Sequence, residues 1–271
     1  MTSPAVNILK SDESVAFQKK LLGRANAVID LAGVTGFRFC SEKRQLAELK
    51  KKFKVSSRGI TFLGPGDFHH LSIYFLERTG PVPVLILFDH HSDMQSSPAG
   101  FVTCGSWARQ ILIEGKVGKC LVVGVSSMEE DLFKDFSGGK VAIFPEDLPH
   151  EKKVSGILME LERIKGPVYI SIDKDVLSEK DAATNWDQGV MSLEELLDLI
   201  EVIGEAVPIV GADVCGEWRI SCDLVFLSGE DIKKASLNEK ANIKILEKLL
   251  EVWQKDKKNS KISLYKSEVR G

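Results

Sequence analysis

Short apolar runs alternate along the chain with longer segments of helical periodicity. The apolar runs have strand length and are rich in β-branched residues; they are Ala27–Leu31, Ile60–Leu63, Val82–Phe88, Cys120–Val125, Val141–Phe144, Val168–Ile172 and Val207–Ala212. The other segments repeat apolar residues at helical spacing; they are Glu42–Phe53, Gly105–Glu114, Lys152–Ile164, Leu193–Ile203 and about Asn238–Trp253. Ser192 favours a helix start at Leu193, because its hydroxyl can cap the first turn.

These elements predict an α/β fold. Continuous apolar sequence such as Val84–Phe88 indicates a strand buried on both faces. Strands that alternate with helices predict a mostly parallel sheet between helical layers, a three-layer α/β/α sandwich. The sequence contains no internal repeat and no low-complexity linker, so we expect a single domain over residues 1–271. The lysine-rich segment from Gln254 to Gly271 is expected to be a solvated tail.

Composition and charge narrow the class of protein. Hydrophobic residues make up 44% of the 271 residues and charged residues 28%, which is typical of a soluble globular protein. A net charge of -3 argues against a nucleic-acid-binding surface. The longest apolar run, Pro81–Phe88, is far shorter than the roughly 20 residues of a membrane-spanning helix, and the N-terminus does not resemble a secretory signal. We therefore expect a cytoplasmic protein that binds neither nucleic acid nor membrane.

Cysteines and histidines are distributed differently. The five cysteines are scattered, odd in number and without a Cys-x-x-Cys pair; they are Cys40, Cys104, Cys120, Cys215 and Cys222. Reduced thiols in a cytoplasmic protein are the expected state. Four of the five histidines instead form two adjacent pairs, His69–His70 and His90–His91. This clustering is the first indication of a chemical site.

Acidic and imidazole side chains follow three of the predicted strands. Ligands of a parallel sheet gather outside the carboxyl ends of its strands. Asp89, His91 and Asp93 come directly after Val82–Phe88, and alternate residues of an extended chain share one face. Asp173 and Asp175 follow Val168–Ile172 in the same way, and a turn after Ile60–Leu63 ends in His69 and His70.

So many buried anions in one place require compensating positive charge. Two divalent cations about 3.5–4 Å apart would supply it, as they do in two-metal hydrolases. Oxygen and nitrogen ligands without a thiolate favour manganese, cobalt or iron over structural zinc. Each motif alone also suits an ordinary polar loop, so the prediction of a metal site depends on their coincidence at three strand ends.

The same motifs resemble those of the ureohydrolases, the family of arginase, agmatinase and formiminoglutamase. Asp89-His90-His91-Ser92-Asp93 resembles their Asp-Ala-His-x-Asp motif, and Ser171-Ile172-Asp173-Lys174-Asp175 their Ser-x-Asp-x-Asp motif. The segment Gly64–His70 resembles Gly-Gly-Asp-His-Ser with one residue inserted, and the resemblance extends roughly from Ile60 to Glu217. It implies an arginase-like fold and two divalent metal ions, with Mn²⁺ favoured, bound by His69, Asp89, His91, Asp93, Asp173 and Asp175.

The inserted residue leaves His70 open as the alternative ligand to His69, and His90 occupies the family's alanine position. Cys104 stands where many of these enzymes have the histidine of a His-Gly pair. It is a catalytic candidate or simply a small residue before a helix, since a thiol is a poorer proton shuttle than imidazole at neutral pH.

Two substrate-binding regions also depart from the family. Glu217 lies one position beyond the glutamate of the family's Asp-x-x-Glu motif, and a bulge at Gly216 could restore its direction. The loop after Asp175 offers Asn185 and Asp187 as substrate contacts. The alternative is a self-hydrogen-bonded loop with Trp186 packed as a plug.

The expected function is hydrolysis of a non-peptide C–N bond in a small cationic amidine or guanidino compound. Asp93 would orient the attacking water and pass its proton to the leaving amine, and Glu217 would hold the cationic end of the substrate. The altered loop and Cys104 argue against arginine itself. The alternatives are a protein that binds metal and a small ligand without hydrolysis, and a mononuclear zinc deacetylase, which needs only three protein ligands. The resemblance is also compatible with a homo-oligomer.

Overall fold

The computed structural model describes residues 3–31, 33–52, 58–128, 133, 136, 138–220 and 227–268. Side chains of the C-terminal helix are described as far as Trp253. Phe53, Cys222 and the side chains of the expected tail from Gln254 therefore lie outside the described residues.

One sheet of eight parallel strands forms the centre of the molecule. Its strands are β1 (Ala5–Lys10), β2 (Ala27–Asp30), β4 (Gly59–Gly64), β5 (Val82–Phe88), β7 (Val117–Val123), β8 (Val141–Phe144), β9 (Val168–Asp173) and β10 (Ile209–Cys215). They lie in the order β2-β1-β4-β10-β9-β5-β7-β8, and each neighbouring pair is parallel. A separate antiparallel pair joins β3 (Cys40–Glu42) to β6 (Phe101–Thr103). The predicted mostly parallel central sheet is confirmed.

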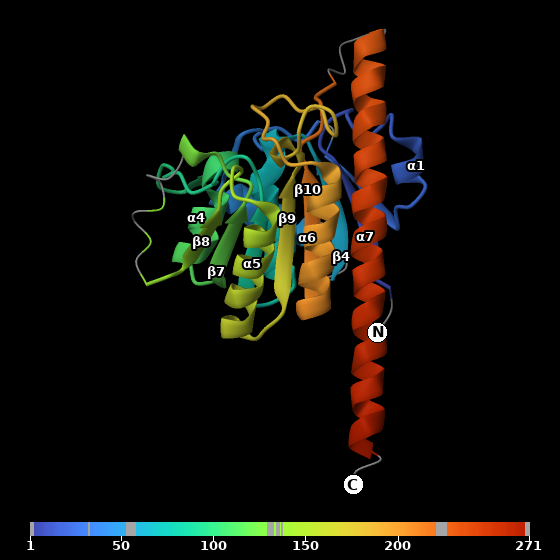
Figure 1. Ribbon diagram of the computed structural model, residues 1–271. Coiled ribbons are helices and arrows are strands. Elements are labelled where there is room, and N and C mark those ends of the chain that lie inside the picture. The colour runs from blue at the N-terminus through green and yellow to red at the C-terminus, as the bar shows by residue number, and fades with distance from the viewer. Residues whose placement is uncertain are drawn as a thin grey trace.

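Helices cover both faces of this sheet. They are α1 (Lys19–Leu22), α2 (Lys43–Lys52), α3 (Ser72–Arg78), α4 (Trp107–Ile113), α5 (His150–Ile164), α6 (Leu193–Ala206) and α7 (Gly229–Glu268). Figure 1 shows α5, α6 and α7 in front of the sheet. No helix in the described ranges combines the length and hydrophobicity that crossing a membrane requires.

The side chains of β5 show why the layers form. Ile86 points to the core shared with α5, α6 and α7, whereas Leu87 points to the core shared with α2, α3 and α4. Both residues are 0% exposed, so the strand is buried on both faces, as its continuous apolar sequence predicts. The three-layer α/β/α architecture is thereby confirmed.

Several elements differ from the sequence prediction, which contains neither the strands β1, β3 and β6 nor the helices α1 and α3. Strand β1 is missing from it because Asn7 interrupts a short apolar run; in the fold, Asn7 is buried and its Nδ2 donates to Thr61 Oγ1 at 3.3 Å. Helix α7 begins at Gly229, earlier than the predicted Asn238, and continues to Glu268 through the segment expected to be a tail.

The central strands set the position of the site. Strands β4, β10, β9 and β5 are consecutive neighbours, so their carboxyl ends lie side by side along one edge. Short 3-10 turns follow two of them, η1 (Gly66–Leu71) after β4 and η4 (Lys174–Val176) after β9. The three segments that carry the predicted ligands therefore meet at this edge.

Candidate metal centre

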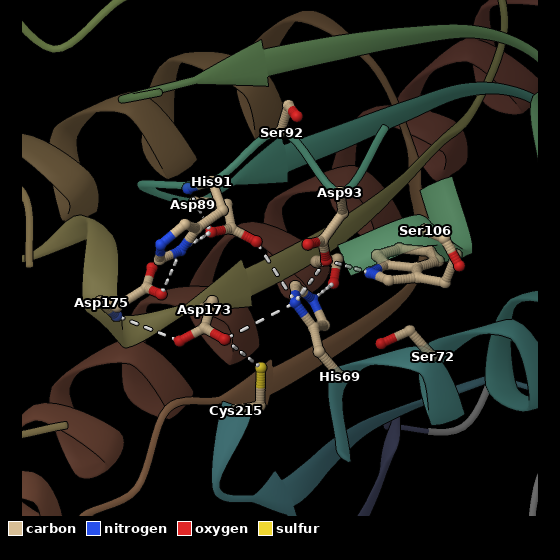
Figure 2. A network of polar contacts seen from close by, with 12 residues as sticks. His69, Ser72, Asp89, His91, Ser92, Asp93, Ser106, Asp173, Asp175 and Cys215 are labelled. Atoms are coloured by element: carbon tan, nitrogen blue, oxygen red, sulfur yellow. Dashed lines mark hydrogen bonds and ion pairs between the residues drawn. The ribbon is translucent and has the colours of Figure 1, made fainter. Parts of the chain in front are cut away.

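His69 lies at the middle of a buried group of carboxylates (Figure 2). Its Nδ1 is 3.1 Å from Asp93 Oδ2, 3.3 Å from Asp89 Oδ2 and 3.6 Å from Asp173 Oδ2. All four side chains are 2–6% exposed. The turn η1 and strands β5 and β9 thus bring four of the predicted ligands together.

The other two predicted ligands, His91 and Asp175, lie beside this group. His91 Nδ1 is 2.9 Å from Asp175 Oδ2 and 3.6 Å from Asp89 Oδ1. Asp89 consequently turns one carboxylate oxygen toward each histidine. Two ligands held about 2.0–2.2 Å from one ion are about 2.8–3.6 Å apart in octahedral or tetrahedral geometry. The observed spacings fit that range, and Asp89 lies between the two histidines.

The two candidate histidines of η1 have different surroundings. His70 points away from the carboxylates: its Nε2 is 2.8 Å from Ser41 Oγ, and its Nδ1 has no hydrogen-bond partner. Burial lowers the pKa of His70 to about 3, so it is neutral at physiological pH. Of the pair, the structure places only His69 in the carboxylate cluster.

A hydrogen-bond chain behind His69 fixes its ring. His69 Nε2 lies 2.9 Å from Ser171 Oγ, and Ser171 donates its single hydroxyl proton to Asp213 Oδ1 at 2.6 Å. Ser171 must therefore accept from His69 Nε2–H, which leaves Nδ1, the ring atom that faces the carboxylates, as the one that could bind a metal. Tyr169 and Ser72 also donate to Asp213, at 2.7 and 3.0 Å. Such supporting carboxylates orient metal-binding histidines in many proteins.

The segment after β5 is not the extended chain that alternation assumes. Asp93 has a φ of 51°, in the left-handed region, and the His91 N–H donates to Asp89 Oδ1 at 2.8 Å. Asp89, His91 and Asp93 still face one centre, while Ser92 points away (Figure 2). The Trp107 indole N–H donates to Asp93 Oδ2. A turn, supported by this indole, therefore achieves the convergence.

The cluster holds protons when no metal compensates its charge. Burial, reinforced by neighbouring carboxylates, raises the pKa of Asp173 and of Asp175 to about 6. Burial would lower the pKa of His91, but hydrogen bonds and charge from Asp175 and Asp89 outweigh it and raise the pKa to about 12. Divalent cations can replace these protons, and oxygen and imidazole donors suit Mn²⁺, Fe²⁺ or Co²⁺. The residues present therefore fit a pair of metal ions.

A pocket of about 420 Å³ opens onto the cluster. Besides the ligand residues, its walls include Phe39, Gln95, Thr103, Cys104 and Trp186. Burial, with the charge of Asp93, raises the pKa of Cys104 to about 12. Cys104 is thus a neutral thiol on the wall of the pocket at neutral pH.

The loop after Asp175 is largely hydrogen-bonded to itself. Thr184 N donates to Gln188 Oε1 at 3.2 Å, and Asn185 Oδ1 accepts from the Arg219 backbone N–H. Asp187 is exposed, and neither it nor Asn185 lines the pocket. Trp186 does line it, and its indole N–H donates to Asp67 Oδ1 at 3.1 Å. Of this loop, the structure therefore places Trp186 at the site in place of the two polar candidates.

Glu217 does not reach the pocket either. It is 3% exposed and forms an ion pair with Lys174, while Gln18 Nε2 and Asn242 Nδ2 each donate to it at 2.6 Å. The chain does bulge here, because the pairing of β10 with β4 shifts register between Val214 and Cys215. Glu217 points into the interior, where it pairs with Lys174, and it does not line the pocket.

One residue at the site has no counterpart in the sequence prediction. Cys215, at the end of β10, has its Sγ 3.1 Å from Asp173 Oδ2 and is fully buried. Its scattered spacing relative to the other cysteines carries no signal. Its position two residues after Asp213, at a strand end, is the only feature of the sequence that could have indicated it.

Solved structures share this fold. Proclavaminate amidino hydrolase from Streptomyces clavuligerus superposes with a TM-score of 0.64 at 19% identity, covering 93% of this chain and 92% of that one. Formimidoylglutamase from Bacillus subtilis superposes with a TM-score of 0.65 at 16% identity, covering 93% of this chain and 87% of that one. Agmatine ureohydrolase of Thermoplasma volcanium gives 0.63 at 16% identity, covering 95% and 92%.

Sequence comparison extends beyond the fold. An uncharacterized protein of Thermotoga maritima is 34% identical over 217 residues, which are 80% of this chain and 81% of that protein. The sequence profile of the arginase family matches residues 52–216, the part of the chain that carries all six clustered ligand residues. The chain belongs to the arginase family.

Proposed function

We propose that the protein hydrolyses a non-peptide C–N bond of a linear amidine or guanidino compound, using two divalent metal ions. The observation that carries this proposal is a cluster at the floor of an open pocket, formed by the partly exposed His91 and the buried His69, Asp89, Asp93, Asp173 and Asp175. The ions, when bound, would lower the pKa of water and polarise the scissile carbon–nitrogen group. We propose that both ions are Mn²⁺. Side chains of the protein would transfer the protons and bind the substrate.

Asp93 is the proposed proton carrier. One of its oxygens accepts from the Trp107 indole, and its left-handed backbone holds the carboxylate toward the centre of the cluster. Burial raises the pKa of Asp93, which favours a carboxyl group that can take a proton from the attacking water and give it to the leaving amine. Cys104 is left with the role of a wall residue, because its thiol stays neutral.

The substrate's cationic end would meet aromatic rings. Since Glu217 is buried elsewhere, the described wall above the ligands offers no further carboxylate. The Trp186 ring lies 6.2 Å from the Phe39 ring and 5.8 Å from the His91 ring, both edge-on. A delocalised amidinium or guanidinium group binds well over such ring faces. We propose a small cationic substrate held between Trp186, Phe39 and the metal ligands.

The test loads metal-free protein with Mn²⁺ and measures urea, ammonia or formamide released from arginine, agmatine, guanidino acids and formiminoglutamate. The proposal expects two bound ions and release from at least one compound, with Asp175→Asn losing roughly 100-fold or more in rate. Asp198→Asn is the matched control, because Asp198 is 54% exposed on α6 and pairs only with His150 among the described contacts.

Three results would contradict the proposal. Two bound ions without turnover of any compound would favour a protein that binds metal and ligand without hydrolysis. One bound ion would favour the mononuclear deacetylase alternative. No metal binding at all would remove the chemical basis of the site.

A further inference from the structure

Cys215 belongs to a group of three buried metal-binding donors. The donor atoms of His69, Asp173 and Cys215 all lie within 4.8 Å of one another. The three residues come from η1, β9 and β10, and Figure 2 shows the Cys215 thiol beside the Asp173 carboxylate and near the His69 ring. The thiol is 0% exposed.

The backbone is built to allow this approach. Cys215 is the direct register partner of Asp173 in the parallel pair β10–β9. Gly216 follows with a φ of 84°, and a Cβ at this position would lie 2.4 Å from Asp173 Oδ1 and 2.6 Å from Lys174 N. Any other residue at position 216 would therefore push β10 away from Asp173. Glycine here lets the chain turn tightly against the metal-binding carboxylate.

The spacing is that of two ligands of one ion. A sulfur about 2.3 Å and an oxygen about 2.1 Å from a metal are about 3.1 Å apart at a right angle and about 3.6 Å apart in a tetrahedron. Cys215 Sγ and Asp173 Oδ2 are 3.1 Å apart, and His69 Nδ1 and Asp173 Oδ2 are 3.6 Å apart. A thiol that only donates a hydrogen bond to Asp173 is the competing interpretation.

We propose that the Cys215 thiolate is a further ligand of the metal ion bound by His69 and Asp173. The inference rests on the proposed two-metal site and adds to it a sulfur ligand. On binding, the Sγ–H proton leaves to solvent and the sulfur lone pair forms the bond to the metal, with no change of oxidation state. A thiolate shifts the preference of that position from Mn²⁺ toward Zn²⁺, Co²⁺ or Fe²⁺. The preference for manganese expected from the sequence assumed ligands without sulfur.

Cobalt provides a readout that does not depend on activity. The protein is freed of metal, loaded with Co²⁺, and its absorption spectrum is recorded with the bound metal quantified. A Co²⁺–thiolate bond gives an intense near-ultraviolet charge-transfer band, which oxygen and nitrogen ligands do not give. The variants are Cys215→Ser and Cys215→Ala. Controls are Cys40→Ser and Cys104→Ser, whose thiols line the pocket, and Cys120→Ala, whose thiol is buried in β7.

The expected result is a sulfur band in the wild type and in all three controls, and its loss in both Cys215 variants. The variants should also lose at least about tenfold in affinity for Co²⁺ or Zn²⁺ relative to Mn²⁺. A wild type that binds two Co²⁺ ions without the band would overturn the sulfur ligand and leave the proposed function intact. A band that persists in Cys215→Ser, or disappears in a control, would equally assign the sulfur elsewhere. If the variants fail to fold, a wild-type band that survives in the three controls and in Cys222→Ser assigns the sulfur to Cys215, because the chain has five cysteines; loss of the band in Cys222→Ser would assign the sulfur to Cys222.

Discussion

Replacing Asp173 by asparagine should stabilise the metal-free protein and weaken the metal-loaded one. Asp173 is completely buried beside Asp175, and burial with that neighbouring charge raises its pKa from 3.8 to about 6. The folded protein therefore binds this proton more tightly than the unfolded chain does. The free energy of unfolding therefore decreases as the pH rises from about 4 to above 6. Asparagine at this position removes that decrease, because it does not ionise.

The size of the effect follows from the pKa shift. A difference of about two pKa units corresponds to about 3 kcal/mol of stability. For a protein of this size that is an increase of roughly 6–10 °C in the unfolding temperature at pH 8, and close to none at pH 4. Metal at 100 times its Kd stabilises the wild type by about 2.7 kcal/mol per site. The variant, which lacks a ligand of the cluster, should gain much less.

The assay is thermal unfolding of both proteins at pH 8 and pH 4, with chelator and with saturating Mn²⁺. We expect the order of stability at pH 8 to invert when metal is added, with the variant ahead in chelator and the wild type ahead in Mn²⁺. The reasoning is refuted if metal-free Asp173→Asn is less stable than the wild type at pH 8, or differs from it equally at both pH values.

Three further predictions concern other parts of the molecule. Asp12 is largely buried and only its Oδ1 accepts a hydrogen bond from Ser14, so burial raises its pKa to about 6. Asp12→Asn should therefore stabilise the protein by at most about 3 kcal/mol at pH 8, and not at pH 4, as measured by urea unfolding. Glu217→Ala should cost about 3–5 kcal/mol in the same assay because it strands the buried Lys174 charge, and the loss should be smaller in Glu217→Gln. Trp186→Ala should raise KM about tenfold with a smaller change in kcat once a substrate is known, whereas an unchanged KM would place the substrate away from this ring.

The sheet and the acidic part of the site follow closely from the sequence. A strand such as Val82–Phe88 is apolar throughout, and in this length range only burial on both faces explains it. Asp89 and Asp173 then follow from topology, because parallel strands bring their carboxyl ends to one edge. The features that could be predicted are those that depend only on the direction of the strands and on which residue ends each strand.

The contributions of single side chains could not be predicted in the same way. Glu217 and Cys215 are set by a register shift and a left-handed glycine, which are decided by packing between β10 and its two neighbours. The choice between His69 and His70 depends on the 3-10 turn after β4, whose three-residue period is not visible in the sequence. Trp186 reaches the pocket because hydrogen bonds of Thr184 and Gln188 fix the conformation of its loop. Such bonds leave no repeating pattern in the sequence from which they could be predicted.

The segment from Asp173 to Asp175, where β9 ends and η4 begins, performs two tasks with adjacent residues. Asp173 and Asp175 face the pocket, while Lys174 between them neutralises Glu217 in the interior. A change at Glu217 therefore disturbs the strand end that carries the proposed metal-binding carboxylates, so substitutions that alter substrate choice are less tolerated there. Phe39, Gln95 and Trp186 line the pocket and are not adjacent in sequence to a residue of this buried ion pair. Close relatives with different substrates should therefore differ in the residues of the pocket wall. The residues of the pocket floor and the buried ion pair should be the same in all of them.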